Sequence, residues 1–378
     1  MALALLMGSP RWRSATVGVF LALLLGAAAC GGSPNTARHS PTTISPSPAQ
    51  ASSLPTPHPL TGAYGVLVSP PGTGSYTVSL VGTDGRVVAS AQATSPAAVT
   101  CANAATAIVP LPVSTSNTRV YFMDAQGVVH FLAPTGETGR ATTVPTGSDS
   151  RRSMFAVSPD DQRIAVIVDD FNSSGAMTRL YVEDLNGGTN HLDLFSQTGA
   201  YTLWPTGWHG SNNLVVAKVA ACKLNGGAIC CLPLELHVVD PATASRRFTL
   251  GGGSCFIAGP PSAAGAACLI SATGDTPAQI KVMSWTAALI KSFSQGAPSA
   301  ALLSPDGHLV GLVSGNTSFD GLQKPDFQLP SMCGWIDDIH VLSGGDTQHQ
   351  PGVGNVNSGV VVPVAAQGDC GGRIPGGL

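Results

Sequence analysis

Residues Phe155–Val168 read FAVSPDDQRIAVIV, and residues Ala301–Val313 read ALLSPDGHLVGLV. Each stretch is an apolar run, a polar turn that begins Ser-Pro-Asp, and a second apolar run. Proline presets φ at the first turn position, and Asp, Asn and Gly tolerate the reversal that follows. Both stretches therefore predict two strands joined by a tight turn. Looser copies of the same pattern occupy Thr206–Ala217 and Cys255–Ser271.

A second pattern is a short strand that ends in a polar or glycine turn. Its copies are Thr77–Val81, Val120–Asp124, Leu180–Asp184, Leu236–Asp240, Ile280–Ser284 and Ile339–Ser343. A period of roughly 40 to 60 residues with about four strands is typical of a β-propeller blade. We therefore predict an all-β fold in residues 61–378, a single β-propeller of six or seven four-stranded blades. We expect a last strand near 359–366 to pair with 63–68 and close the ring, which protects the sheet edges.

These motifs resemble the TolB-like family of WD40-like propellers. The resemblance rests on the Ser-Pro-Asp turns at 158–161 and 304–307, each followed by an apolar strand, and on the Asp-Leu-Asn-Gly-Gly ending at 184–188. It implies a toroid of six or seven blades. It also implies a structural role for the turn aspartate, which transfers to Asp160 and Asp306 only.

The amino-terminal region predicts export. Residues 17–29 form an apolar run of about 13 residues behind Arg11 and Arg13, which is shorter than the roughly 20 residues that span a bilayer as a helix. Ala27–Cys30 resembles the bacterial lipobox, in which the cysteine receives a diacylglycerol and the chain is cut before it. We expect 1–29 to be a lipoprotein signal peptide, with translation from Met1 or Met7, and Cys30 to be lipidated. An uncleaved membrane anchor is the alternative.

Residues 30–60 carry the predicted lipid and a tether rich in Ser, Thr and Pro, with few aliphatic side chains. Such a segment buries too little apolar surface to offset the cost of ordering, so we expect it to be disordered. The predicted location is the extracytoplasmic side of the cell membrane, where the lipid makes the membrane a partner.

The chain has nine cysteines. Without Cys30 an even number remains, which in an exported protein favours four disulfides. Two pairings have a structural motive: Cys255 with Cys268 across a turn, and Cys222 with one of two cysteines beyond a glycine-rich loop. The candidate disulfide cysteines are Cys101, Cys222, Cys230, Cys231, Cys255, Cys268, Cys333 and Cys370.

Composition narrows the function. Charged residues are only 10% of the chain, the formal charge is −3 and no basic stripe occurs, so nucleic acid is not expected as a partner. The sequence has no hydrolase nucleophile elbow, no His-Glu-x-x-His, no P-loop and no paired Cys-x-x-Cys. We therefore assign no catalytic residue, metal site or cofactor.

Several polar and aromatic residues have both a binding and a structural interpretation, and the structural one is favoured for each. His237 and His340 occupy equivalent repeat positions and could face a central channel, but a hydrogen-bonded strand histidine is more common. Adjacent acids in a strand point to opposite faces, so the pairs at 169–170 and 337–338 are interpreted as turn caps. Trp208, like the other tryptophans of the repeats, is expected to pack between blades.

Two functions remain. The first is a membrane-anchored binding or scaffolding propeller that presents a disc face to a protein, peptide or glycan. The second is an envelope enzyme, a lyase or hydrolase of cell-wall or sugar material, with its site at a channel mouth. The sequence does not concentrate polar residues in one motif, which favours the first.

Overall fold

The computed structural model describes residues 54–69, 74–100, 107, 109–172, 175–222, 233–253, 255–294, 300–314, 316–320, 327 and 329–378. The chain divides into two compact units, Met1–Ala49 and Gln50–Leu378. The predicted signal peptide, Cys30 and the tether as far as residue 53 lie outside the described residues. Within the described ranges every element is a β-strand, and no helix is long and apolar enough to cross a membrane.

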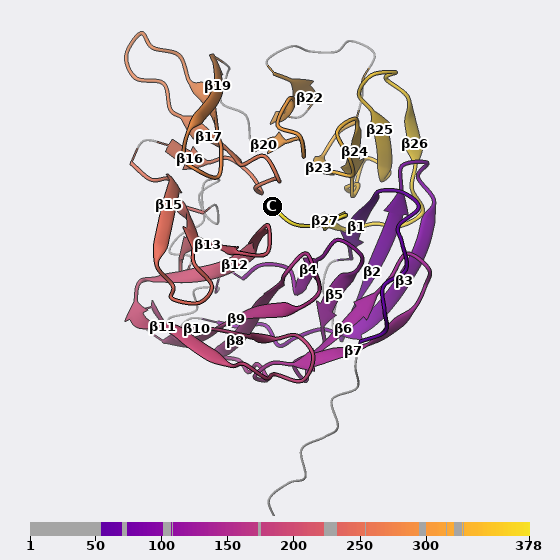
Figure 1. The fold of residues 1–378 in the computed structure, drawn as a ribbon. Helices are drawn as coiled ribbons and strands as arrows, with labels where there is room; N and C mark the ends of the chain where they lie inside the picture. Colours follow the sequence, from indigo (N-terminus) through magenta and orange to yellow (C-terminus); the bar gives the residue numbers. More distant parts are fainter. Residues whose placement is uncertain are drawn as a thin grey trace, which may run out of the picture. The chain divides into compact units, whose positions relative to one another are not determined.

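The second unit forms seven sheets, the blades of a β-propeller (Figure 1). The predicted propeller is confirmed, with seven blades rather than six. Blades 1 to 3 are β27 (Asp369–Ile374), β1 (Tyr64–Val68), β2 (Ser75–Gly82) and β3 (Val87–Thr94); β4 (Val113–Thr115), β5 (Val120–Met123), β6 (Val128–Leu132) and β7 (Thr138–Thr143); and β8 (Arg151–Val157), β9 (Arg163–Asn172), β10 (Gly175–Asp184) and β11 (Leu192–Gly199).

The remaining blades follow in chain order, each listed from its innermost strand outwards. Blade 6 has three described strands and the others have four. Blades 4 to 7 are β12 (Tyr201–His209), β13 (Asn213–Ala220), β14 (Glu235–Val239) and β15 (Arg246–Gly251); β16 (Cys255–Ile257), β17 (Ala266–Ile270), β18 (Gln279–Met283) and β19 (Leu289–Ser294); β20 (Ala300–Leu303), β21 (Val310–Ser314) and β22 (Asn316–Phe319); and β23 (Met332–Trp335), β24 (His340–Ser343), β25 (Gly352–Asn355) and β26 (Val361–Pro363).

The core lies between the blades, because successive side chains of a strand point to opposite faces of its sheet. Strand β9 shows the alternation. Its Ile164, Val166 and Val168 pack with blade 2, whereas Ala165 and Ile167 pack with blade 4. Seven such clusters fill the seven interfaces between neighbouring blades. Each blade is thus held by both of its neighbours.

The ring is closed by β27, which pairs antiparallel with β1 from Tyr64 opposite Ile374 to Val68 opposite Asp369. The expectation that a strand near 359–366 pairs with residues 63–68 was therefore wrong, because residues 361–363 form β26 and pair with β25. Close packing explains the sequence of β27. A Cβ at Gly371 would lie 2.8 Å from the side chain of Val68, so the strand needs glycine where propensity argues against a strand.

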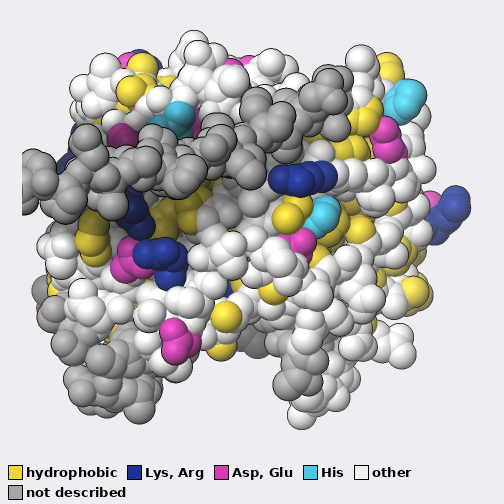
Figure 2. All heavy atoms as spheres, turned by 90° about the horizontal axis from the view of Figure 1, so that it is seen from below, with side chains coloured by type: hydrophobic (Ala, Val, Ile, Leu, Met, Phe, Trp, Pro, Cys, Tyr) yellow, Lys and Arg dark blue, Asp and Glu magenta, His cyan; other side chains and the backbone are white. Residues whose placement is uncertain are grey.

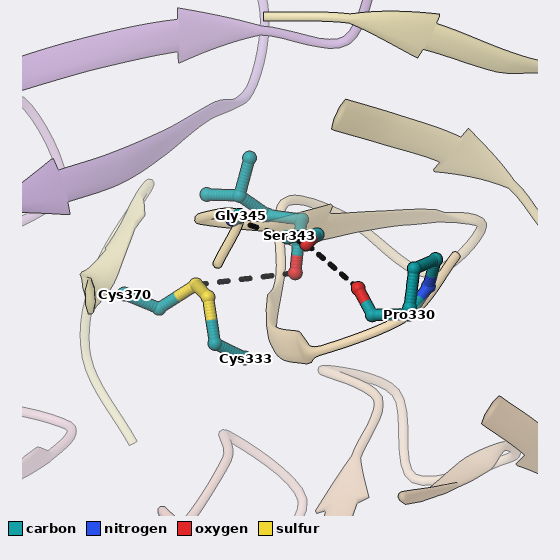
Figure 3. Close-up of a disulfide and its surroundings, with 6 residues drawn as sticks. Pro330, Cys333, Ser343, Gly345 and Cys370 are labelled. Atoms are coloured by element: carbon teal, nitrogen blue, oxygen red, sulfur yellow. Dashed lines mark hydrogen bonds between the residues drawn. A yellow bond between two sulfur atoms is a disulfide. The ribbon is translucent and has the colours of Figure 1, made fainter. Parts of the chain in front are cut away.

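Disulfides reinforce two places in the ring. The predicted Cys255–Cys268 pair is confirmed and joins β16 to β17, with 5.4 Å between the Cα atoms. Cys333–Cys370 joins β23 of blade 7 to the closing strand β27, beside Ser343, whose hydroxyl donates to the carbonyl of Pro330 (Figure 3). Cys222 is also disulfide-bonded. Cys101, Cys230 and Cys231 lie outside the described residues.

Candidate functional site

The Ser-Pro-Asp turns lie where the first and second strands of blades 3 and 6 connect. The carboxylate of Asp160 accepts hydrogen bonds from Ser158 Oγ at 2.6 Å and from the backbone N–H of Gln162 at 3.2 Å. Asp306 accepts from Ser304 Oγ at 2.6 Å and from the N–H of His308 at 3.0 Å. Burial alone would raise the pKa of both carboxyls, but these hydrogen bonds bring the pKa of each below its usual value.

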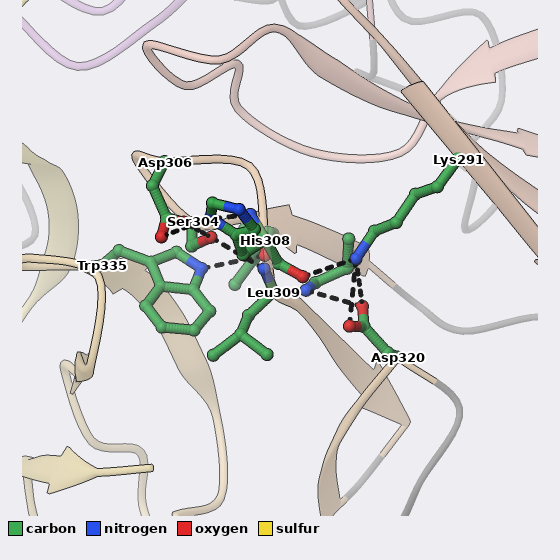
Figure 4. A network of polar contacts seen from close by, with 9 residues as sticks. Lys291, Ser304, Asp306, His308, Leu309, Asp320 and Trp335 are labelled. Atoms are coloured by element: carbon green, nitrogen blue, oxygen red, sulfur yellow. Dashed lines mark hydrogen bonds and ion pairs between the residues drawn. The ribbon is translucent and has the colours of Figure 1, made fainter. Parts of the chain in front are cut away.

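The same turns also connect neighbouring blades. Ser211 Oγ of blade 4 donates to Asp160 at 2.8 Å, and the backbone N–H of Asp306 donates to Asp338 of blade 7 at 2.9 Å. Figure 4 shows Asp306 close to the indole of Trp335, while Lys291 reaches Asp320 on the other side of the same turn. We call the end of the ring that carries these turns the turn face.

Buried tryptophans join innermost strands of adjacent blades. Trp208 Nε1 donates to the carbonyl of Ala156 in blade 3 at 3.0 Å, and Trp335 Nε1 donates to the carbonyl of Leu302 in blade 6 at 2.8 Å. The two indoles therefore make the same contact in two interfaces. This agrees with the expectation that the repeat tryptophans pack between blades.

The recurrent histidines do not line the centre of the ring. His237 lies on the third strand of blade 4 and pairs with Glu235 at 2.7 Å. His340 lies on the second strand of blade 7 and pairs with Asp337 at 2.8 Å. Both are hydrogen-bonded strand residues, as the favoured interpretation expected. Among the residues that the structure describes, no group of three His, Cys, Asp or Glu could hold a metal.

The two acid pairs behave differently. Asp337 caps the turn before β24, where the N–H groups of Ile339 and His340 donate to its Oδ1. Asp169 and Asp170, in contrast, lie within the paired length of β9, so their interpretation as turn caps was wrong. Their side chains do point to opposite faces. Asp169 is fully buried, and Asp170 pairs with two arginines at the surface.

One end of the chain occupies the turn face near the centre of the ring (Figure 1). The N–H of Gly376 donates to the carbonyl of Ser116 in blade 2, and the N–H of Leu378 donates to the carbonyl of Trp208 in blade 4, both at 2.7 Å. His209 Nδ1 contacts the carbonyl oxygen of Leu378 at 2.5 Å. Residues 376–378 thus contact blades 2 and 4 at the turn face.

The segment before β1 reaches the same face. Residues 54–60 were assigned to the tether, but the side chains of Leu54 and Leu60 pack against the clusters on either side of blade 2. Beneath them the buried guanidinium of Arg119 donates to the carbonyl of Pro55 and lies 4.6 Å from the ring centre of Phe131. The chain therefore enters the propeller at the turn face.

A wide, open cavity lies elsewhere, on the rim between blades 1 and 2. We call it the rim groove; its volume is about 710 Å³. One wall is the outermost strand of blade 1, residues 90–94, and the other comes from β5, β6 and β7 of blade 2. The lining residues of blade 2 are Phe122, Asp124, Gln126, His130, Thr138, Gly139 and Arg140.

Three of these form a row across blade 2. Phe122 is the register partner of His130, and His130 is the register partner of Arg140. The imidazole stacks on Phe122 with 5.5 Å between ring centres, and its Nε2 pairs with Asp124 at 2.9 Å. The groove thus has an aromatic floor, an oriented histidine and an exposed arginine. Its volume falls within the range of roughly 300–1,000 Å³ that is typical of ligand sites.

Sequence reasoning did not predict the rim groove. Its residues belong to strands that are separate in the sequence, and among them only Phe122 and Asp124 fall in a repeat that the sequence shows, Val120–Asp124. The only signal is the run of alternate alanines at 89, 91 and 93, whose small side chains leave space at a blade interface.

No family model matches the chain, and no curated protein matches it. Solved structures similar to it include TolB from Acinetobacter baumannii, at 12% identity and a TM-score of 0.40, covering 83% of this chain and 66% of that one. The β-propeller domain of the Trilobed protease from Pyrococcus furiosus is similar at 12% identity and a TM-score of 0.40, covering 78% and 94%. This chain spans less than two thirds of the TolB chain. Likenesses of this kind carry no conclusion about activity or partners.

Proposed function

We propose that this protein is a lipid-anchored, extracytoplasmic binding or scaffolding propeller that presents its surface to a protein, peptide or glycan partner. The observation that carries the binding function is the rim groove, an open cavity of about 710 Å³ with an oriented histidine and an exposed arginine. A rigid ring that is closed on itself is a suitable support for such a groove, since neighbouring blades fix both of its walls.

The anchoring part of the proposal rests on Cys30 after three alanines and on the apolar run before them. Disulfides such as Cys255–Cys268 and Cys333–Cys370 are typical of proteins in an oxidising compartment, which supports export. Diacylglycerol and a further acyl chain on one residue would hold the protein durably, whereas a single chain binds membranes only marginally.

The surface charge supports a partner other than nucleic acid. On the face drawn in Figure 2, basic, acidic and histidine side chains are scattered among apolar ones, without a continuous patch of one sign. We carry forward the binding function, because the rim groove supports it.

The anchor is tested by mass spectrometry and fractionation of the full chain produced in a bacterium that lipidates exported proteins. Wild type should be found in the membrane fraction with a modified Cys30 at its amino terminus. Cys30→Ala should carry no acyl chains, and Ser33→Ala should behave as wild type. An intact wild-type chain with an unmodified Cys30 would refute the anchor and leave the binding function standing.

Binding is tested by cross-linking in intact cells, with wild type compared to a variant in which the rim groove is filled, Ala91→Leu. A partner should be captured by wild type and lost with Ala91→Leu. Val88→Leu is the matched control, because Val88 lies on the same strand but outside the groove lining. Capture that is equal for all three proteins would remove the rim groove as the binding site.

A further inference from the structure

We propose that the rim groove binds an extended peptide, which pairs with β3 as an added strand and places an acidic side chain against Arg140. This inference rests on the proposed function and names the class of partner for the same site.

The first step is the edge of β3. This eight-residue strand is the outermost one of blade 1, so no described strand pairs with its outer edge. A free edge presents unpaired N–H and C=O groups, and proteins usually guard such edges with charged residues or proline. Residues 87–94 contain neither. The outermost strands of the other four-stranded blades do carry such residues: Arg140 in β7, Asp193 in β11, Arg247 in β15, Lys291 in β19 and Pro363 in β26.

The second step is the space beside that edge. Ala89, Ala91 and Ala93 point towards blade 2 and pack in the interface with Phe122. Larger side chains at these positions would fill the gap between the two blades. With alanine there, the gap stays open as the rim groove. A peptide on the β3 edge directs alternate side chains to the same side, so one of them enters this gap.

The third step is the balance of hydrogen-bonding groups around the groove. The carboxylate of the groove already has donors: Asp124 Oδ1 accepts from the N–H groups of Gln126 and Val128, and Oδ2 pairs with His130. Gln126 Oε1 accepts from Thr94 at 3.4 Å. Donors remain, because Arg140 is exposed and donates to Thr143 through Nη2 alone.

An acceptor-rich group therefore fits better than a donor. A carboxylate matches the planar fork of a guanidinium and forms charge-assisted hydrogen bonds with it. The acidic side chain of the peptide thus supplies a negative partner for the guanidinium of Arg140. Backbone pairing with β3 fixes the orientation of the peptide.

The test uses the purified full chain and three synthetic probes. The first is a blocked heptapeptide of alternating threonine and valine with one central glutamate, the second has glutamine in place of that glutamate, and the third is a hexuronic acid oligomer. Binding is followed by titration of the protein, with chemical-shift or hydrogen-exchange changes in β3 as the readout of position.

We expect the glutamate peptide to slow amide exchange in β3 and to bind about tenfold more tightly than the glutamine peptide. Arg140→Gln should remove that difference, and Ala91→Leu should abolish binding, whereas Val88→Leu should change neither. These variants alter exposed or groove-lining positions, and their fold is checked by thermal unfolding.

Two results would overturn the inference. If the glutamate and glutamine peptides bind wild type with equal affinity, the proposed contact between an acidic side chain and Arg140 is refuted. Binding of the hexuronic oligomer, without binding of either peptide, would replace the peptide by a glycan and leave the proposed function intact. If no probe binds but cellular cross-linking is lost with Ala91→Leu, the proposed function stands and the strand-pairing peptide is refuted.

Discussion

Replacing Asp169 by asparagine should change how the stability of the propeller depends on pH. Asp169 lies on β9 and is fully buried at the interface of blades 3 and 4. Its carboxylate accepts hydrogen bonds from the hydroxyls of Thr178, at 2.6 Å, and Thr202. Burial raises the pKa of Asp169 to about 6, and the two hydroxyls offset only part of that effect.

The sign follows from the direction of the shift. The folded-state pKa lies above the value of about 3.9 for an unfolded chain, so the protonated form is favoured in the folded protein. The stability that the protonated Asp169 contributes is complete below pH ~4 and is lost as the pH rises through about 6. A shift of roughly two pKa units corresponds to about 3 kcal/mol. Asparagine does not titrate, so the Asp169→Asn variant does not lose this contribution of about 3 kcal/mol to the unfolding free energy as the pH rises.

The assay is urea unfolding of wild type and Asp169→Asn between pH 4 and pH 8. The free energy of unfolding of the variant minus that of wild type should increase by about 3 kcal/mol across this range. Any change in hydrogen bonding adds an offset that does not depend on pH. The effects of other titrating groups cancel in the difference, and most of the increase should fall between pH 4 and pH 6.

The neighbouring Asp170 gives a matched control. It is partly exposed and pairs with Arg151 at 2.5 Å and Arg179 at 3.1 Å. Asp170→Asn loses these ion pairs and should not gain stability relative to wild type as the pH rises. A flat difference for Asp169→Asn, or one that falls towards pH 8, would refute the assignment of a raised pKa to this carboxyl.

Three further predictions concern the ring and its ends. Replacing Cys333 and Cys370 by serine should cost about 4 kcal/mol of unfolding free energy, for a separation of 37 residues, and should speed amide exchange in β27. Replacing Cys255 and Cys268 of blade 5 by serine, with a separation of 13 residues, should cost about 3 kcal/mol and leave the amides of β27 protected from exchange. Equal amide exchange in β27 of the two double variants would contradict the role of Cys333–Cys370 in closing the ring. Trp335→Phe should cost about 1–3 kcal/mol in thermal unfolding, because it removes the hydrogen bond from the indole to a buried carbonyl of blade 6. An unchanged melting temperature would argue against that bond. Arg119→Met should make residues 54–60 several-fold more sensitive to limited proteolysis while the blades stay resistant, whereas the exposed control Arg86→Met should not; equal cleavage would show that Arg119 does not hold the segment.

The repeats in the sequence predicted the fold because a blade is a local unit. The Ser-Pro-Asp turns at 158–161 and 304–307 each carry the residues that a tight reversal needs. In the structure the fourth turn position is left-handed, with φ of 60° at Asp161 and 77° at Gly307. The hairpin partners of these turns are close in the chain, so pattern and propensity were sufficient there.

Long-range features were not predictable in the same way. Residues 371–378 look like a frayed end because of their glycines, yet Gly371 lies in β27, where a Cβ would come within 2.8 Å of the side chain of Val68 in β1. The rim groove arises from missing side-chain volume at Ala89, Ala91 and Ala93, opposite residues far away in sequence. A cavity between blades depends on which strands meet, and the sequence does not state that directly.

The pairing of β1 with β27 also has a consequence for the order of assembly. A chain synthesised from its amino terminus delivers β1, β2 and β3 early, but blade 1 stays without its innermost strand until residues 369–374 are made. During that interval the apolar inner edge of β1 is open to pairing with other chains. Folding that waits for so distant a contact is slow. Newly made molecules are therefore most at risk of aggregation before residues 369–374 pair with β1.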